Sequence, residues 1–499
     1  MAIPLRFPPE DAFALVRAFL RECGYTEGAI CRRQGVTSQA QLLLRHPRNP
    51  PAPAGDALGV LISVFLLGEF GGREAVEAFI PPSVLAAFQS LGLLEKDGEV
   101  YHAAAALYPV RNVFIASDRW NNPDGKPLEA QPDIVYPANT PNTLRLLRYL
   151  PEDAAGTVLE ACSGTGVAAL LAATRYARRA WAVDITHRST EFARFNCRLN
   201  GVNNVEVLEG DLYEPVRGLQ FDRIVAHPPY VPAVKPKYVF QDAGEGGESI
   251  TRRLVEGLPQ FLAPGGRFYC LTLGFDRAGE SYETRIRRWL GPRESEFDLL
   301  VAVVERRLPT ELAADFLLKG LIHHAEFLER QKAFEEVADE FLYSFLVIQR
   351  AASARPVFTV RRMMSPRTGA AQLEWLRRLQ TAMMSPETAP NPALMRPRAP
   401  QPVELSGSYL LRDGRIETTS FTMQVDYPLY GMLGVEPWVG NLLALCDGRS
   451  SGRDLYFRCR REKWLAPEVG EEDFYRLLAG LLTGGFIEVE GFSLPGAEE

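Results

Sequence analysis

Apolar residues recur at helical spacing in the first part of the chain. One such stripe is formed by Ala12, Leu15, Val16, Phe19 and Leu20. Further helices are expected over residues 58–70 and 81–96, and the turn-forming pair Asp97-Gly98 precedes two expected strands within residues 99–117. Residues 1–115 are therefore predicted to form an N-terminal helical, winged-helix-like domain. Such a domain binds nucleic acid, docks a protein or packs on its neighbour, and we favour docking or packing.

The pattern then changes to short apolar runs that alternate with amphipathic segments. Strands are expected near residues 157–161, 180–184, 205–209, 222–226, 266–274, 297–305 and 341–349. Helices are expected near residues 166–178, 189–200, 249–262 and 281–290, with a helical insertion over 308–338. This alternation predicts an α/β domain over residues 116–350, with a Rossmann-like, seven-stranded core at 151–350.

The last part of the chain has a different composition. Residues 351–402 are rich in arginine and proline and are interpreted as a basic, Pro-rich linker with one short helix; a basic strap over a polyanion or an active site is the alternative. In residues 403–499, Asp413-Gly414 marks a hairpin. Helices near 437–446, 452–459 and 471–483 follow, and then a strand within 486–492. We expect a small C-terminal α+β, winged-helix-like domain.

Composition excludes several classes of protein. The 499 residues carry a formal net charge of -7, so the chain lacks the overall basic charge of a nucleic-acid-binding protein, although a local basic patch stays open. The seven cysteines include no Cys-x-x-Cys pair, and neither a disulfide framework nor a metal site is expected. No run of about 18 apolar residues predicts a membrane span, and the N-terminus does not resemble a signal peptide, so we expect a cytoplasmic protein.

A glycine-rich loop follows the first strand of the alternating region. Glu160 ends the apolar run, and the loop contains Cys162, Gly164, Thr165 and Gly166. Glycines let the backbone approach a ligand, and the helix that follows presents its N-terminus to it. The stretch resembles motif I of class I methyltransferases that bind S-adenosylmethionine (SAM), with Cys162 in place of the first glycine. Nicotinamide and flavin folds carry similar loops.

Two carboxylates at later strand ends support an adenosine-containing cofactor. Asp184, followed by Ile185, is spaced to accept hydrogen bonds from ribose hydroxyls. The methyltransferase resemblance implies that Asp211 accepts from the adenine amino group and that the Leu212 backbone lies beside the ring. Either aspartate alone is equally well a helix cap or a turn residue. Their order and spacing together favour SAM as the cofactor.

The fourth strand ends in His227, Pro228, Pro229 and Tyr230. This run is similar to the Asn/Asp/Ser-Pro-Pro-aromatic motif of methyltransferases that act on planar nitrogens: adenine or guanine amino methyltransferases and the HemK-like enzymes that methylate protein glutamines. The resemblance implies that the first side chain and a proline carbonyl accept the two N–H bonds of the substrate, while the aromatic ring stacks on it.

His227 departs from this motif. A neutral imidazole accepts one N–H bond or takes a proton as a base. An oxygen acceptor and a lost activity therefore stay open, and a proline-rich turn with a packing tyrosine is the structural alternative. By the same resemblance, Tyr136 lies in a segment that covers the methionine end of the cofactor, and Gly244 and Gly247 shape the acceptor pocket.

These patterns together predict a SAM-dependent N-methyltransferase that acts on a macromolecule. Nucleic acid and protein glutamine are nearly even as acceptors: the arginine-rich stretch favours nucleic acid, and the acidic total charge favours protein. A small molecule or natural-product peptide is the alternative substrate. The alternative of another class is a catalytically weak, SAM-binding regulatory protein, supported by Cys162 and His227. No membrane or metal partner is expected.

Overall fold

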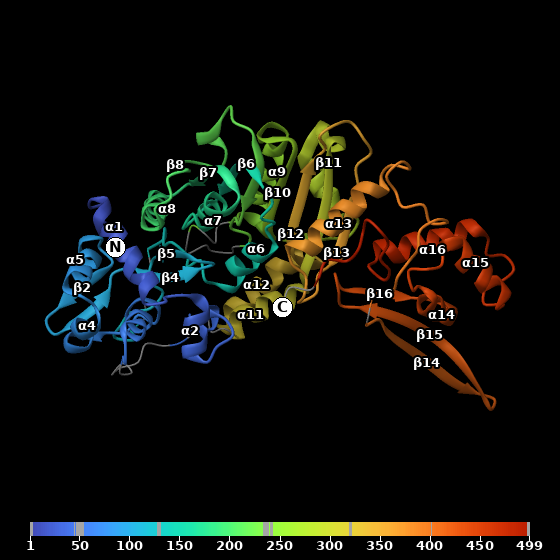
Figure 1. Ribbon diagram of the computed structural model, residues 1–499, viewed down its shortest axis with the longest axis horizontal. Coiled ribbons are helices and arrows are strands. Elements are labelled where there is room, and N and C mark those ends of the chain that lie inside the picture. Colours follow the sequence, from blue (N-terminus) through green and yellow to red (C-terminus); the bar gives the residue numbers. More distant parts are fainter. Residues whose placement is uncertain are drawn as a thin grey trace.

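The computed structural model describes residues 3–43, 45, 54–126, 131–232, 239, 243–318, 322–400 and 402–496. Viewed along its shortest axis, the molecule forms an arch (Figure 1). The N-terminal helices lie at one end of the arch, a large sheet lies in the middle, and the C-terminal helices and hairpin lie at the other end. No helix in these ranges is long and apolar enough to cross a membrane.

The N-terminal end packs helices against a small antiparallel sheet of order β1-β3-β2. Its helices are α1 (Glu10–Glu22), α2 (Glu27–Gln34), α3 (Ala57–Leu61), the π-helical turn η2 (Ile62–Leu66), α4 (Arg73–Phe79) and α5 (Pro82–Ser90). Its strands are β1 (Gly71–Gly72), β2 (Leu94–Asp97) and β3 (Val100–Ala103). Gly98 has a φ of 55°, so the Asp97-Gly98 turn joins β2 to β3 instead of preceding both strands. The winged-helix assignment stays a prediction.

A second hairpin, β4 (Ala106–Val110) and β5 (Val113–Ser117), connects this end to the central sheet. The predicted boundary between residues 115 and 116 is therefore wrong, because it falls inside β5. Helix α8 (His187–Asn200) binds the hairpin through two asparagines. The Asn196 amide bonds to both the N–H and the C=O of Ala116, and the Asn200 amide does the same with Phe114. These side chains satisfy the β5 backbone as a neighbouring strand would.

The central sheet has the order β13-β11-β12-β10-β9-β6-β7-β8. Its strands are β6 (Ala155–Ala161), β7 (Ala177–Asp184), β8 (Val205–Glu209), β9 (Phe221–Ala226), β10 (Leu262–Asp276), β11 (Phe297–Arg307), β12 (Glu340–Arg350) and β13 (Thr359–Met363). Strands β6 to β10 are parallel, and β12 pairs antiparallel with β10 and β11. The predicted Rossmann-like arrangement is confirmed, but among the described residues the sheet has eight strands and not seven.

The eighth strand, β13, corrects the prediction of a linker over residues 351–402. It pairs in parallel with β11, and helix α13 (Ala370–Met383) buries an apolar face that includes Trp375. Two arginines of this segment form ion pairs with earlier parts of the chain: Arg355 with Asp298, and Arg361 with Asp276 and Glu283. Composition suggested a linker because these charges are compensated only by carboxylates far away in the sequence. The same pairing argues against a free basic strap.

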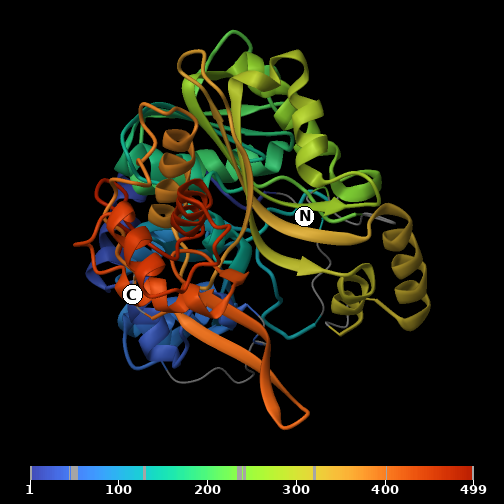
Figure 2. The ribbon, with the colours of Figure 1, turned by 90° about the vertical axis from the view of Figure 1, so that its right-hand side faces the viewer.

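Helices cover both faces of this sheet. Helices α6 (Pro141–Tyr149), α7 (Val167–Arg175) and α13 share one buried cluster with it, and α9 (Ser249–Phe261) and α10 (Tyr282–Leu290) share another. Helices α11 (Pro309–Leu318) and α12 (His324–Val337) occupy the stretch between β11 and β12. Figure 2 shows this helical pair projecting beside the sheet.

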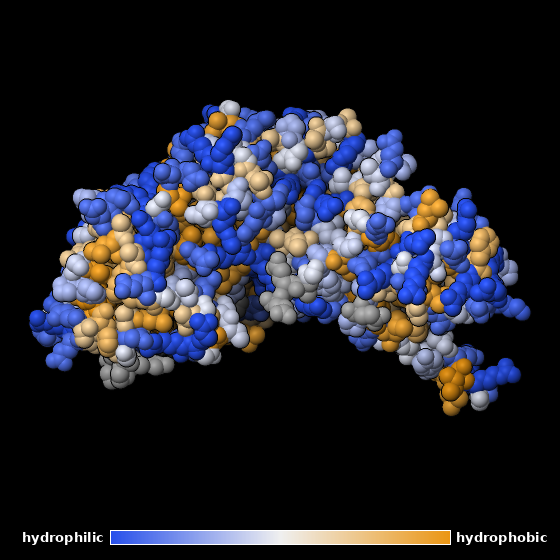
Figure 3. Space-filling view, in the orientation of Figure 1, coloured by the Kyte–Doolittle hydropathy of each residue, from blue (hydrophilic) through white to orange (hydrophobic). Residues whose placement is uncertain are grey.

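The C-terminal end consists of a long hairpin and three helices. The elements are β14 (Glu404–Arg412), β15 (Arg415–Val425), β16 (Gly431–Gly434), α14 (Pro437–Leu445), α15 (Gly452–Arg461) and α16 (Glu471–Thr483). The hairpin expected at Asp413-Gly414 is confirmed, since both residues have positive φ. Its tip projects from the body and carries exposed apolar and charged side chains (Figures 2 and 3). Residues 486–492 make only isolated bridges and not the expected strand.

Candidate functional site

The carboxyl ends of four parallel strands meet at one edge of the central sheet. Ala161 at the end of β6 pairs with Val183 of β7 on one side and with Ala226 of β9 on the other. The loop after β6 and the turn after β9 therefore lie side by side, as the sequence predicts. A cavity of about 500 Å³ lies at this edge.

The predicted site residues gather around this cavity. Its wall contains Tyr136, Glu160, Cys162, Gly164, Thr165, Asp184, Ile185, Asp211, Leu212, His227, Pro228, Pro229 and Tyr230. Gly166 does not line the cavity. It is the N-cap residue of helix α7 and has a φ of 72°. A Cβ on Gly166 would lie 2.9 Å from the Cβ of Ala193, so this glycine permits close packing of α7 against α8.

The backbone of the loop after β6 is turned toward the cavity. Cys162 occupies the place of the missing glycine and has a φ of 55°, a left-handed conformation that glycine would adopt without strain. Gly164 has a φ of 51°, and a Cβ there would meet nothing within 4 Å. The loop thus leaves open space beside its backbone, where a ligand can approach.

Two carboxylates hold this loop in place. The buried Glu160 carboxylate accepts hydrogen bonds from the N–H groups of Ala168 and Ala169, at 3.2 and 2.8 Å, and so caps the start of α7. Burial raises the pKa of Glu160 to about 8. Asp184 accepts from the Gly164 N–H at 2.8 Å and from Thr186. The Asp184 carboxylate therefore links the loop after β6 to the end of β7, and it also lines the cavity.

Asp211 has a partner that the motif did not reveal. Arg253, on helix α9, also lines the cavity, and its guanidinium lies 2.6 Å from the Asp211 carboxylate. Leu212 follows with a φ of 49°, which turns the backbone beside Asp211. The helical spacing of α9 predicted a helix, but no local pattern indicated which strand end Arg253 would reach.

The His-Pro-Pro-Tyr turn forms another part of the wall. Burial lowers the pKa of His227 to about 4, so its imidazole is neutral at physiological pH. The rings of His227 and Tyr230 are nearly parallel, with an interplanar angle of 23° and centroids 5.7 Å apart. A Cβ on Gly247 would lie 2.7 Å from the carbonyl oxygen of Tyr230, so Gly247, one of the two glycines expected to shape this pocket, permits the close approach.

Asn142, in the first turn of α6, is a second cavity residue that the sequence did not reveal. Its side-chain amide donates to the hydroxyl of Tyr230 at 2.7 Å. The helix-start signal Thr140-Pro141 precedes it and is real, because Thr140 accepts from the Thr143 N–H. That signal predicts the helix but not the side chain that its first turn presents.

Tyr136 is held by contacts from two other regions. Its ring meets that of Trp120 edge-on, with centroids 5.2 Å apart. Asp118 accepts from the N–H of Val135 and forms a buried ion pair with Arg188 of α8. The segment before α6 is thus attached to the same helix that packs against the glycine-rich loop.

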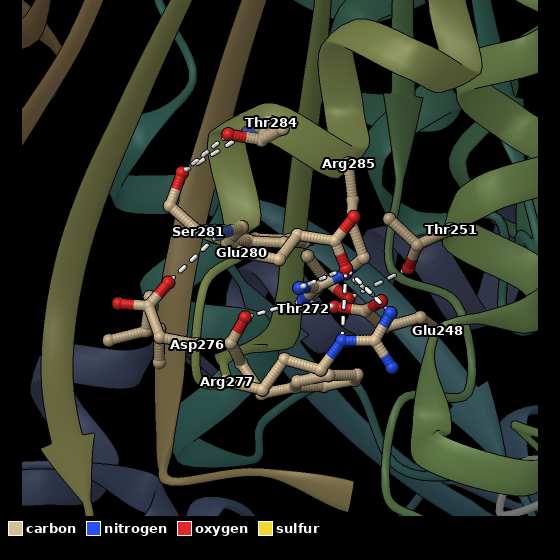
Figure 4. A network of polar contacts seen from close by, with 12 residues as sticks. Glu248, Thr251, Thr272, Asp276, Arg277, Glu280, Ser281, Thr284 and Arg285 are labelled. Carbon is tan, nitrogen blue, oxygen red and sulfur yellow. Dashed lines mark hydrogen bonds and ion pairs between the residues drawn. The ribbon is translucent and has the colours of Figure 1, made fainter.

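A buried polar network supports the segment before α9. Glu248 forms a two-point ion pair with Arg285 of α10, and Thr251 bonds to Thr272 of β10 (Figure 4). Glu248 directly follows the turn η5 (Glu245–Gly247) that packs against Tyr230. The network therefore holds the turn behind the His-Pro-Pro-Tyr segment.

The cavity fits SAM in size and in the kind of groups that line it. A glycine-loop backbone, two carboxylates at adjacent strand ends and the apolar side chains of Ile185 and Leu212 suit an adenosine group. Within the described ranges, no three His, Cys, Asp or Glu side chains are grouped to hold a metal ion.

Comparisons with known proteins point in the same direction. The Methyltransferase small domain family matches residues 141–285. A protein of Methanocaldococcus jannaschii, provisionally named protein N5-glutamine methyltransferase, is 32% identical over 149 residues, 29% of this chain and 74% of that protein.

Two further relatives match over shorter shares of their length. The ribosomal protein uL3 glutamine methyltransferase of Bradyrhizobium diazoefficiens is 31% identical over 28% of this chain and 48% of its own. The release factor glutamine methyltransferase of Moorella thermoacetica is 33% identical over 24% of this chain and 47% of its own. The chain thus spans about half the length of these two relatives.

Proposed function

This chain belongs to the HemK-like group of class I methyltransferases, whose methyl donor is SAM, and from this premise we propose that it methylates the side-chain amide nitrogen of a protein glutamine. The observation that supports the proposal is the shared cavity. We call the loop at Cys162–Gly166 with Asp184 and Asp211 the cofactor wall. We call the turn at His227–Tyr230 with Asn142 the acceptor wall.

The acceptor wall provides groups for an amide nitrogen. Bound SAM would supply an electrophilic methyl group. The neutral His227 imidazole accepts one N–H bond, and the Pro228 carbonyl accepts the other, which turns the nitrogen lone pair toward the cofactor wall. The side chain of Tyr230 borders the same part of the cavity.

His227 also suits the proton that the nitrogen must release. Burial holds the pKa of His227 near 4, which makes it a weak base. An N-protonated amide is a far stronger acid than an imidazolium ion, so a weak base is sufficient. The histidine that replaces the usual motif residue can therefore serve both as a hydrogen-bond acceptor and as a proton acceptor.

A protein acceptor is favoured over a nucleic-acid base. The relatives are named for protein glutamines, and the arginines of residues 351–402 that argued for nucleic acid include Arg355 and Arg361, which are paired with carboxylates of the sheet. The terminal regions, which lie outside the family match over residues 141–285, are proposed to recognise the rest of the acceptor.

The test is methyl transfer from labelled SAM to three acceptors: release factor, ribosomal protein uL3, and total RNA from the same cells. We expect label in a protein and, by peptide mass spectrometry, one methyl group on a glutamine. Asp184→Ala is the inactive control. Label in RNA alone, or no transfer to any acceptor, would contradict the proposal.

A further inference from the structure

The hydroxyl oxygen of Tyr230 accepts a hydrogen bond from within the protein. Asn142 Nδ2 lies 2.7 Å from Tyr230 Oη. A carboxamide can present either its oxygen or its nitrogen to a phenol, so the direction of this bond depends on what the other end of the Asn142 amide contacts.

Arg145 sets that direction. Its Nη1 lies 3.4 Å from Asn142 Oδ1, and a guanidinium can only donate. The amide oxygen of Asn142 therefore faces Arg145, and the amide nitrogen donates to Tyr230. The guanidinium is itself held over the ring of Tyr343, 5.4 Å from its centroid.

The proton of Tyr230 is then left to donate elsewhere. Burial raises the pKa of Tyr230 to about 12, although the neighbouring Tyr343 hydroxyl and the Asn142 amide lower it, so the phenol stays protonated at neutral pH. Asn142 donates to this hydroxyl, and the neighbouring Tyr343 hydroxyl also lowers the pKa of Tyr230, as a donor to it would. Tyr230 also lines the cavity.

We propose that the phenolic O–H of Tyr230 donates a hydrogen bond to the carbonyl oxygen of the acceptor amide, which then lies at the hydroxyl edge of the ring, so that this hydroxyl selects a carboxamide. The inference rests on the proposed function. It completes the complement to a primary amide: His227 and the Pro228 carbonyl accept the two N–H bonds, and Tyr230 donates to the C=O. An amine without this oxygen would leave the phenol unpaired, which costs affinity.

Tyr230→Phe is the first test, because it removes the hydroxyl and keeps the ring. We expect kcat/KM for the protein acceptor to fall about tenfold or more, with the Kd for SAM and the melting temperature unchanged. The affinity for the acceptor in the presence of S-adenosylhomocysteine, measured without turnover, should weaken in parallel. Tyr269→Phe is the matched control, since that hydroxyl is buried in the sheet.

Asn142→Asp tests the direction of the bond. A carboxylate has the same shape but accepts the phenolic proton, so the Asn142–Tyr230 contact persists while the donor to the substrate is lost. We expect a loss similar to that of Tyr230→Phe, and no further loss when the two changes are combined. If the contact with residue 142 only held Tyr230 in place, the Asn142→Asp variant would keep the activity of the wild type. That result would overturn the inference.

The outcomes separate this inference from the function on which it rests. If the wild-type chain labels no protein, the proposed function fails before any variant is compared. If it labels a protein and Tyr230→Phe is as active as wild type, only the role of the hydroxyl is wrong. A Tyr230→Phe variant that loses SAM affinity instead of acceptor affinity would assign the hydroxyl to a cofactor carboxylate and also overturn the inference.

Discussion

The two walls of the cavity are built in different ways. The cofactor wall is held by bonds between neighbouring strand ends: Asp184 binds the Gly164 N–H, and Glu160 caps the helix that follows. The acceptor wall depends on distant elements, since Asn142 comes from α6 and the supporting turn precedes α9. Backbone contacts restrict the residues that a loop can use, whereas a side-chain scaffold can be rearranged. The first loop is therefore fixed by contacts close to it, whereas the acceptor wall is fixed by elements that lie far away in the sequence.

The strongest test of the cofactor wall is Asp184→Ala. It removes the bonds to Gly164 and Thr186 together with the expected ribose contact, so the Kd for SAM should rise about 100-fold. Isothermal titration with S-adenosylhomocysteine measures this. Asp222→Ala is the control. Asp222 lies at the start of β9, where it accepts a hydrogen bond from Thr157, and this end of the strand is far from the strand ends that form the site. Unchanged affinity in Asp184→Ala would remove Asp184 from the cofactor wall.

Substitutions of His227, in the acceptor wall, should change the rate of methyl transfer and not the affinity for SAM. His227→Asn supplies an amide oxygen that accepts an N–H bond, so kcat should stay within about threefold of wild type, while His227→Phe should lose about 30-fold. Neither change should alter SAM affinity. Steady-state transfer to the protein acceptor provides the comparison. Loss of activity in His227→Asn equal to that in His227→Phe would mean that the imidazole is an essential base.

The pH profile sharpens the same point. Burial lowers the pKa of His227 to about 4, so the active neutral imidazole is present above that pH and is lost as the pH falls through it. Once protonated, His227 can no longer accept an N–H bond, and kcat should fall about tenfold per pH unit below 4. Single-turnover rates after a brief acid jump test this. Asn has no such titration, so a low-pH fall that is identical in His227→Asn would assign it to another group.

The smallest effect is expected behind the acceptor wall. Glu248→Gln weakens the buried pair with Arg285 and loosens the turn that supports Tyr230, so the KM for the acceptor should rise about fivefold. Affinity for SAM should not change. Glu256→Gln, within helix α9 that follows Glu248, removes an exposed pair with Arg252 and is the matched control. Equal behaviour of the two variants would separate the network from the acceptor wall.

Local sequence predicted that the residues of the cofactor wall would lie together at one edge of the sheet. The run from Glu160 to Gly166 and the carboxylates Asp184 and Asp211 follow apolar strands, and parallel strands end at one edge of a sheet. Cys162 is the exception that tests this reasoning: the position still adopts the left-handed φ of the glycine it replaces. The turn at His227 was equally predictable, because it directly follows the neighbouring strand.

Other features could not be derived from local pattern. The composition of residues 351–402 is that of a linker. In the structure, however, β13 pairs with β11, and Arg361 forms ion pairs with Asp276 and Glu283. Similarly, Arg253 and Asn142 gave no signal, because their partners lie far away in the sequence. Charge and polarity are visible in a sequence, but the identity of the partner that satisfies them is not.

The amino-acid sequence by itself determined the parallel sheet, the glycine loop and the order of acidic strand ends, because periodicity and turn chemistry act over a few residues. Only the tertiary structure decided that Asn142 donates to Tyr230, that Arg253 pairs with Asp211 and that a supposed linker completes the sheet. These contacts depend on which distant surfaces meet when the apolar core is buried, and no short stretch of sequence contains that information.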